Sequence, residues 1–314
     1  MKAKHFLKIT DLTGKEILEV LKISQKTKQE LKKTGKSKSF FNDQTMAMIF
    51  EKPSLRTRIS FEIGMTQLGG HAIYLGPSDI QMGKRETPFD VGKVTASMAD
   101  IIMARTFKHE TIEELALGST VPVINALSDL EHPCQILADF LTILEKKKTT
   151  KGLKLAYFGD AKNNVTHSLV LCSALLGCDF YCASPKDYKM NRKIFAEAKK
   201  IAVKTKVNIV ETADVNKAAS KADVLITDTW VSMGNEKEAK KRLRIFPKYQ
   251  VNKKVTKQAK KDAIFMHCLP AYREKEVSSE VIDGPQSVVF QEAENRLHAQ
   301  KGLIIFLLKK GGSK

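Results

Sequence analysis

The chain alternates between short apolar runs and longer segments with helical spacing of apolar residues. In the first half the apolar runs predict four strands, at residues 46–50, 72–75, 101–105 and 121–127. Three helix starts lie between or after them: Thr87 before Pro88, a capping box of Thr111 with Glu114, and Pro133. Repeated strand–helix units of this kind predict a parallel sheet covered by helices on both faces.

The alternation resumes in the second half, with strands expected at residues 153–158, 178–183, 208–211, 224–227 and 263–268. The polar run 146–152 between the halves is predicted to be a hinge. The helical pattern of about 285–310 is expected to cross back onto the first domain with Arg296. A length of 314 residues also favours two domains. The predicted fold is α/β, with two doubly wound parallel-sheet domains and a cleft between them. The first domain is expected at residues 1–148 and the second at residues 149–290. A C-terminal helix at residues 291–314 is expected to pack back on the first domain.

Composition favours a soluble protein. No apolar run approaches the roughly 18 residues of a membrane span, and the first residues lack a secretory apolar core. Cytoplasmic location is therefore expected. The odd number of cysteines and the lack of a disulfide or zinc spacing fit a reducing compartment, where most would be buried; they are Cys134, Cys172, Cys178, Cys182 and Cys268.

The formal net charge is +18. Such a charge suits a nucleic-acid binder, a membrane-surface protein or an enzyme with anionic substrates. The lysines are spread over many predicted helices and do not form one stripe interleaved with aromatic residues. A solvated surface explains most of them, and nucleic-acid binding stays an alternative that rests on the net charge alone.

The segment Ser54–Arg58 carries two guanidinium groups and two hydroxyls on a predicted strand-to-helix turn. Backbone N–H groups and the positive dipole end at a helix N-terminus favour a phosphate, and arginine adds donors matched to its oxygens. The segment therefore predicts an anion site. A capped surface helix with two solvated arginines is the alternative from these residues alone.

Other polar residues also follow predicted strands. Arg105 ends one strand, and His132 precedes the helix that opens at Pro133. In the second half Asn164, Asp228 and Cys268 lie at strand ends. In doubly wound sheets ligands bind beyond the carboxyl ends of the strands, which makes these residues candidates for a substrate site.

The turn Gly159–Asn164 and Cys268, both in the second half, bear on the class of enzyme. The turn Gly159–Asn164 lacks the glycine spacing of a dinucleotide fingerprint, and no acid ends the next strand at Cys182–Pro185, so a nicotinamide enzyme is disfavoured. Cys268 is either a buried thiol or a nucleophile paired with a histidine such as His267 or His132.

Together these segments resemble the ornithine carbamoyltransferases over nearly the whole chain. The resemblance rests on an ordered set of motifs: Glu51–Arg58, Arg105, Ser128–Gln135, Asp160–Asn164, Asp228–Gly234, His267–Pro270 and Glu294–Arg296. The family pattern usually has threonine where this chain has Leu55. That departure removes a hydroxyl and leaves the backbone N–H, so anion binding is expected to survive.

The resemblance implies roles for specific residues. Those implied to bind carbamoyl phosphate are Ser54, Leu55 through its backbone, Arg56, Thr57, Gln81 of a neighbouring subunit, Arg105, His132, Pro133, Cys134, Gln135, Cys268, Leu269 and Arg296. Those implied to bind ornithine are Asn164, Asp228, Ser232 and Met233, with Cys268 and Leu269 near its side-chain amine. Those implied to be catalytic are Arg105, His132, Asp228 and Cys268. The resemblance further implies trimers or assemblies of trimers, and neither a metal nor an organic cofactor.

Related activities differ in the second substrate. Aspartate carbamoyltransferase takes an anion, which Asp228 would disfavour, and a putrescine-using relative needs no site for a substrate carboxylate. A role in arginine biosynthesis is implied by the resemblance, whereas the residues leave open whether the cell runs the reaction toward citrulline or backward.

Overall fold

The computed structural model describes residues 4–83, 85–231 and 236–311. The chain divides into two compact units, one of Met1–Leu141 with Glu294–Lys314 and one of Thr142–Ala293. Most of the C-terminal helix therefore groups with the first unit. The boundaries expected from the sequence, after residues 148 and 290, lie a short distance along the chain from these divisions.

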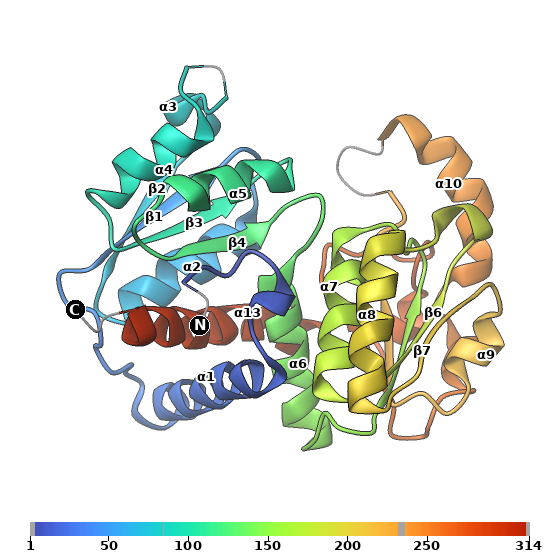
Figure 1. The fold of residues 1–314 in the computed structure, drawn as a ribbon. Helices are drawn as coiled ribbons and strands as arrows, with labels where there is room; N and C mark the ends of the chain where they lie inside the picture. Colours follow the sequence, from blue (N-terminus) through green and yellow to red (C-terminus); the bar gives the residue numbers. More distant parts are fainter. Residues whose placement is uncertain (1–3, 84, 232–235, 312–314) are drawn as a thin grey trace. The chain divides into compact units, whose positions relative to one another are not determined.

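The first unit is built on a four-stranded parallel sheet of order β2-β1-β3-β4. The strands are β1 (Thr45–Phe50), β2 (His71–Leu75), β3 (Ile101–Arg105) and β4 (Val123–Leu127). The helices are α1 (Gly14–Thr34), α2 (Leu55–Gln67), α3 (Pro77–Ile80), α4 (Pro88–Ala96), α5 (His109–Gly118), the start of α6 (Pro133–Lys147) and most of α13 (Val289–Gly311), with a 3₁₀ turn η1 (Ile9–Asp11). Helices α4 and α5 lie on one side of the sheet, and α2 and α13 lie on the other (Figure 1).

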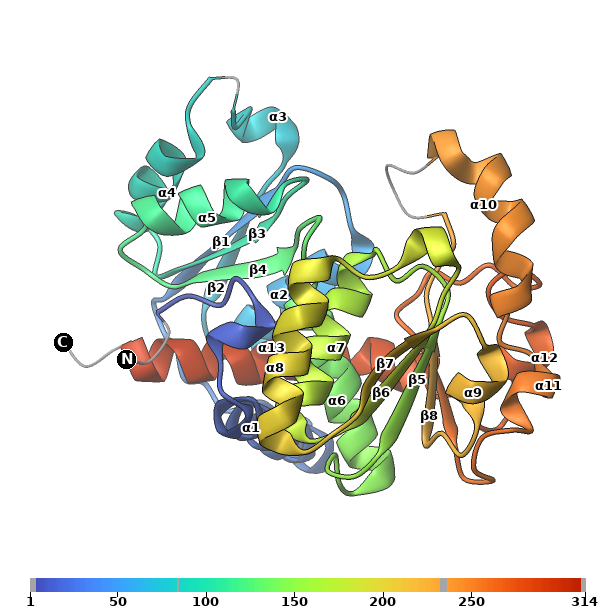
Figure 2. The ribbon, with the colours of Figure 1, turned by 45° about the vertical axis from the view of Figure 1, so that its right-hand side comes forward.

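The second unit is built on a five-stranded parallel sheet of order β7-β6-β5-β8-β9. The strands are β5 (Lys154–Phe158), β6 (Asp179–Ala183), β7 (Ile209–Thr212), β8 (Val224–Thr227) and β9 (Ile264–His267). The helices are α7 (Asn164–Leu176), α8 (Arg192–Thr205), α9 (Val215–Ala219), α10 (Ala239–Ile245), α11 (Lys253–Thr256) and α12 (Ser279–Ile282), with 3₁₀ turns η2 (Lys186–Tyr188), η3 (Glu236–Glu238) and η4 (Phe246–Tyr249). Helices α7 and α8 lie on one side of the sheet, and α9, α11 and α12 lie on the other (Figure 2).

Each sheet has a fully buried apolar core on its strands. In the first unit Ile49, Ile102 and Val123 pack with apolar residues of α4 and α5. In the second unit Phe158 and Phe265 pack into a cluster of buried apolar and aromatic side chains. Burial on both faces accounts for the apolar runs of β1, β3, β4, β5, β8 and β9, whereas the edge strands β2 and β7 are partly exposed. The two doubly wound sheets confirm the predicted fold class.

Two helix starts test the predicted capping signals. Thr87 caps α4 as expected: its hydroxyl accepts a hydrogen bond from the N–H of Asp90, and Pro88 is the first helical residue. The capping box at Thr111 is wrong, because α5 begins two residues earlier, at His109. The Asp129 carboxylate accepts from the N–H of His109 at 2.8 Å, so a distant segment supplies the cap.

The N-terminal helix α1 lies outside the elements expected from the sequence. Its start follows a full capping box, in which Thr13 accepts from the N–H of Glu16 and the Glu16 side chain accepts from the N–H of Thr13. Its buried apolar residues are Ile17, Val20 and Leu21. In the described residues no helix combines the length and apolar character needed to cross a membrane.

The strand orders place a reversal in each sheet. In the first unit the chain leaves β1 to one side for β2 and returns to its other side for β3. In the second unit the same reversal separates β5 from β8. Loops diverge beyond the carboxyl ends of the strands at such points, and both sets of predicted site residues follow these strands.

Candidate active site

The turn after β1 is an N-terminal helix cap with two hydroxyls in contact. Ser54 caps α2, and its Oγ accepts from the N–H of Thr57 at 3.4 Å and donates to Thr57 Oγ1 at 3.0 Å. Leu55 is the first helical residue, and its side chain is 71% exposed. The structure confirms that this segment is a helix N-terminus, where backbone N–H groups favour an anion.

The two arginines of the turn differ. Arg58 Nε donates to Glu62 Oε2 at 3.0 Å, and its guanidinium lies 4.1 Å from the centre of the Tyr74 ring. Arg58 is thus held by partners on the exposed side of α2. Arg56 is close enough to His132 for its charge to lower the pKa of that imidazole.

Arg105 ends β3 in a buried position, 6% exposed. It is in register with Phe50, the last residue of β1, and its Nη1 lies 3.4 Å from Thr57 Oγ1. The parallel register therefore brings the end of β3 to the start of α2. The guanidinium and the hydroxyls predicted from separate motifs lie together at the carboxyl edge of the sheet.

His132, Gln135 and Arg296 are all buried. Gln135 projects from the first turn of α6, and its Oε1 accepts from Arg296 Nη1 at 2.7 Å. The Gln135 amide in turn donates to Asp139 Oδ1 at 2.8 Å. Arg296 of the C-terminal helix thus contacts a motif that lies far away in the sequence.

Burial and the positive charge around His132 both lower the pKa of its imidazole. Burial lowers that pKa well below its usual value, and the neighbouring cations Arg296, Arg105, Lys52 and Arg56 lower it further. His132 is therefore a neutral imidazole at neutral pH, able to donate one N–H. A buried region with this many cations is a strong attractor for a small anion.

Lys52 belongs to this cationic region, and the sequence analysis gave it no role. Burial, followed by the charge of Arg105, lowers its pKa to about 8. Its ammonium also lies 4.9 Å from the centre of the Phe107 ring. Its position inside the Glu51–Arg58 motif was a possible signal, but only the fold shows that its side chain lies beside Arg105.

The remaining first-unit candidates have mainly local contacts. Pro133 is the first residue of α6. Cys134 is buried with its thiol 3.3 Å from the Asn125 carbonyl oxygen, and burial raises its pKa to about 12, so it is a packed thiol. Gln81 lies in the exposed turn that ends α3, with φ +51°. Its placement in a neighbouring subunit's site stays a prediction.

In the second unit, Asp228 follows β8 and receives three hydrogen bonds. They come from Thr229 N at 2.7 Å, Cys268 Sγ at 3.3 Å and Asn163 Nδ2 at 3.3 Å. Burial raises the pKa of this carboxyl group. A ligand ammonium would stabilise the ionised form, so the site suits a cationic group. Asn164 is the first residue of α7, directly after the Asn163 cap.

Cys268 and His267 do not form a nucleophile–base pair through the hydrogen bonds described here. The His267 Nδ1 accepts from the N–H of Leu269 at 2.9 Å, which leaves the ring proton on Nε2, 3.3 Å from Glu276 Oε1. The Cys268 thiol donates to Asp228 instead. Two predicted ornithine residues, Ser232 and Met233, lie outside the described residues.

Asp228, His267 and Cys268 also offer three potential metal ligands whose atoms lie within 4.8 Å of one another. Both ring nitrogens of His267 are used, Nδ1 as an acceptor and Nε2 toward Glu276. A metal would have to displace one of these contacts. The arrangement therefore favours a hydrogen-bonded positioning network over a metal centre.

Arg242 was missed by the sequence analysis, although it ties the loops of this unit together. Its Nη1 donates to Asp160 Oδ2 at 2.5 Å and to the Trp230 carbonyl oxygen at 3.0 Å. Its Nε donates to Glu238 Oε2 at 3.0 Å. One buried guanidinium thus links the turn after β5 with the segments on both sides of residues 232–235.

Two models of known protein domains match this chain, one in each half of the sequence. The model of the aspartate/ornithine carbamoyltransferase carbamoyl-P binding domain matches residues 4–145, and that of the Asp/Orn binding domain matches 151–307. The ornithine carbamoyltransferase of Anoxybacillus flavithermus is 49% identical, over 98% of this chain and 98% of its own. The chain belongs to the ornithine carbamoyltransferase family.

Solved structures of the family have the same fold. The Pyrococcus furiosus ornithine carbamoyltransferase is 46% identical, with a TM-score of 0.94 over 99% of this chain and 98% of its own. The anabolic ornithine carbamoyltransferase of Campylobacter jejuni is 42% identical, with a TM-score of 0.91 over 99% of this chain and 100% of its own. Membership of this family extends over both units.

The pKa of Lys52 predicts a pH dependence of anion binding. As pH rises from 7 to 9, Lys52 loses its charge, so competitive inhibition by inorganic phosphate should weaken several-fold. Lys52→Arg keeps its charge throughout, and its inhibition constant should change little over the same range. The measurement is the phosphate inhibition constant at each pH. The exposed control Lys108→Arg should behave like the parent, and equal pH dependence in Lys52→Arg would exclude Lys52 as the cause.

Proposed function

We propose that the protein transfers the carbamoyl group of carbamoyl phosphate to the side-chain amine of L-ornithine, giving L-citrulline and phosphate. The observation that carries this proposal is the set of cations that surround neutral His132: Lys52, Arg56, Arg105 and Arg296. They suit a small phosphorylated substrate. Family membership and the buried Asp228 support ornithine as the second substrate.

The phosphate group would bind at the start of α2, held by Ser54, the backbone of Leu55, Arg56 and Thr57. Gln135 would bind the carbamoyl amide together with the backbone around Pro133. Arg105, His132 and Thr57 would donate to the carbonyl oxygen, whose negative charge grows as the tetrahedral intermediate forms. A neutral His132 serves this role, because a neutral imidazole carries one N–H that can donate a hydrogen bond to this oxygen.

Ornithine would bind through Asp228 on its α-ammonium and Asn164 on its carboxylate, with Ser232 and Met233 completing the site. Its side-chain amine has an ordinary pKa near that of lysine, about 10.4, and must be neutral to attack. A cationic surrounding lowers such a pKa and so favours the reactive form. Cys268 would lie near the side-chain amine, and its hydrogen bond to Asp228 fixes the position of its thiol.

The reaction itself is a direct attack. The amine lone pair forms a bond to the carbamoyl carbon, the tetrahedral intermediate collapses, and the bond from that carbon to the phosphate oxygen breaks. The proton lost by the nitrogen passes to the departing phosphate. Holding both substrates in place removes the cost of a bimolecular encounter, and no covalent intermediate on Cys268, metal or organic cofactor is required.

A side-by-side assay tests the substrate. With carbamoyl phosphate, L-ornithine should give stoichiometric phosphate and citrulline, whereas putrescine and L-aspartate should react at least about 100-fold less efficiently, because each lacks or reverses a charge that the site binds. The measurement is kcat/KM for each amine. Comparable turnover of putrescine or aspartate would reject ornithine as the specific substrate.

The two arginines of the turn provide a matched pair of variants. Arg56→Ala should lower kcat/KM on the order of 100-fold or more, because a charge-assisted contact to phosphate is lost. Arg58→Ala, on the same helix, should stay within a few-fold of the parent, since its partners are Glu62 and Tyr74. If the two folded variants had equal activity, the phosphate site would be misassigned.

The proposal includes a homotrimer, or an assembly of trimers, in the cytoplasm, with Gln81 completing the site of the adjacent chain. The exposed turn of α3, which presents Gln81 outward, is consistent with such a contribution. A role in arginine biosynthesis is part of the same proposal.

Mixed trimers test the shared site. Arg105→Ala and Gln81→Trp should each be inactive alone. Unfolding the two together and reassembling them at equal ratio should restore about a quarter of the sites, because a closed head-to-tail ring then pairs some intact Arg105 with an intact neighbouring Gln81. Mixed trimers verified by mass that stay inactive would show that Gln81 does not act across subunits.

A further inference from the structure

A second basic region lies in the second unit, apart from Asp228 and Cys268. It is a cavity of about 770 Å³, large enough for a nucleotide-sized ligand. It lies where the loops after β5 and β6 meet the start of α8. The charged residues that line it are Lys162, Lys186, Asp187, Lys189, Arg192 and Lys193.

The charges in this cavity are unbalanced. Five cations face one carboxylate, that of Asp187. Arg192 has a distant ion pair, with Nη1 4.0 Å from Glu211 Oε2, and its side chain is 74% exposed. The Lys162 ammonium lies 5.5 Å from the centre of the Tyr188 ring. Like charges gathered in a concave surface raise the local potential, and a bound anion would relieve their repulsion.

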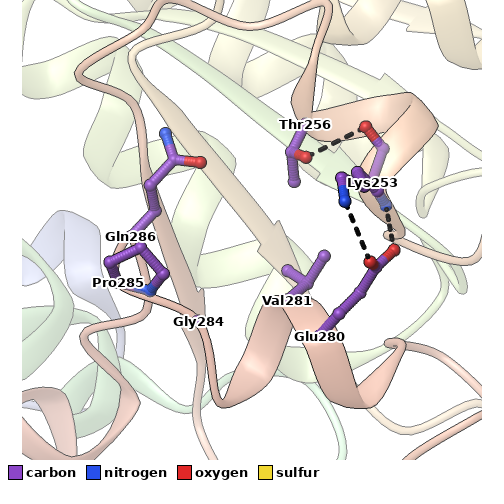
Figure 3. A pocket seen from close by; sticks show the side chains of 7 residues that line it. All are labelled: Lys253, Thr256, Glu280, Val281, Gly284, Pro285 and Gln286. Atoms are coloured by element: carbon purple, nitrogen blue, oxygen red, sulfur yellow. Dashed lines mark hydrogen bonds and ion pairs between the residues drawn. The ribbon is translucent and has the colours of Figure 1, made fainter.

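In another cavity of the same unit, a lysine is paired with a carboxylate that lines the same cavity. In the cavity of about 280 Å³ in Figure 3, the Lys253 ammonium lies 3.7 Å from Glu280 Oε2, and the Lys253 N–H donates to Glu280 Oε1. That lysine has its counter-charge within the wall of the cavity. The excess of cations is therefore a property of the larger cavity and not of every hollow on this lysine-rich surface.

The place of the larger cavity in the fold indicates the chemistry of the ligand. In dinucleotide-binding sheets of this type, an acid at the end of the second strand binds the ribose 2′-hydroxyl, whereas a basic residue there accommodates a single 2′-phosphate. Basic residues after the second strand are thus compatible with a phosphate, and the five lining cations of this cavity exceed what one phosphate would need. Here β6 ends at Ala183 and is followed by Lys186 and Lys189. The 14-residue helix α8 adds its positive N-terminal end.

We propose that this cavity binds a small anion with two or more linked phosphates. Pyrophosphate and a nucleoside diphosphate share that chemistry. The proposal does not depend on the carbamoyl transfer reaction.

Calorimetry with the full chain tests the proposal, using pyrophosphate and ADP as separate probes. The Arg56→Ala background weakens phosphate binding at the catalytic site, so binding that persists there reports the second cavity. In this background Lys186→Gln with Lys189→Gln should weaken binding about tenfold or more, the loss expected for one or two charge-assisted contacts. Tighter binding of ADP would identify the nucleotide as the source of the phosphates, and equal binding would identify free polyphosphate.

Matched variants separate a site from general charge. Lys253→Gln with Lys254→Gln removes the same two charges from exposed positions on α11 and should leave the affinity unchanged. Asp187→Asn removes the one lining carboxylate and should tighten binding, a gain that misfolding cannot produce. Equal loss in both lysine pairs, no gain in Asp187→Asn, disappearance of binding with Arg56→Ala, or binding of duplex DNA alone would each overturn the proposal.

Discussion

Two buried arginines and two half-buried cations lie close to His132 in the first unit, and compensating their charge is the main physical constraint on this region. Arg105 and Arg296 are almost fully buried, and Lys52 and Arg56 lie near enough to lower the pKa of His132. Removing such groups from water is costly unless hydrogen bonds hold them. The contacts of Arg296 with Gln135 and of Arg105 with Thr57 contribute to that compensation.

The buried charged groups of the second unit include carboxylates, among them Asp160 and Asp228, whose burial must also be compensated. Asp228 is held by donors from three separate residues, and Asp160 is paired with the buried guanidinium of Arg242. These bonds fix the loops after β5, β8 and β9 relative to one another within the unit. The first unit therefore carries a buried guanidinium group at a strand end, whereas the second unit carries buried carboxyl groups at its strand ends.

The sequence predicted the fold and the strand-end positions of the candidate site residues, since apolar runs and strand-end motifs reflect local rules. Ser54, Arg105 and His132 could be assigned to one edge because parallel strands end on the same side. What it could not give were interactions set by tertiary packing. Tertiary packing decides the environments of Lys52 and Arg242 and supplies the cap that Asp129 gives to α5. It also places the Arg58 guanidinium against Glu62 and Tyr74.

The exposure of Leu55 has an evolutionary consequence. Ser54 and Thr57 hold each other through their hydroxyls, and both side chains are therefore tied to the geometry of the turn. Leu55 instead presents its side chain to solvent while its backbone occupies the first position of α2. Natural selection can act on the N–H at this position without acting on the side chain. A family motif can then drift at residue 55, from a hydroxyl to a branched alkyl group, without any change in the surface that the phosphate would meet through the main chain.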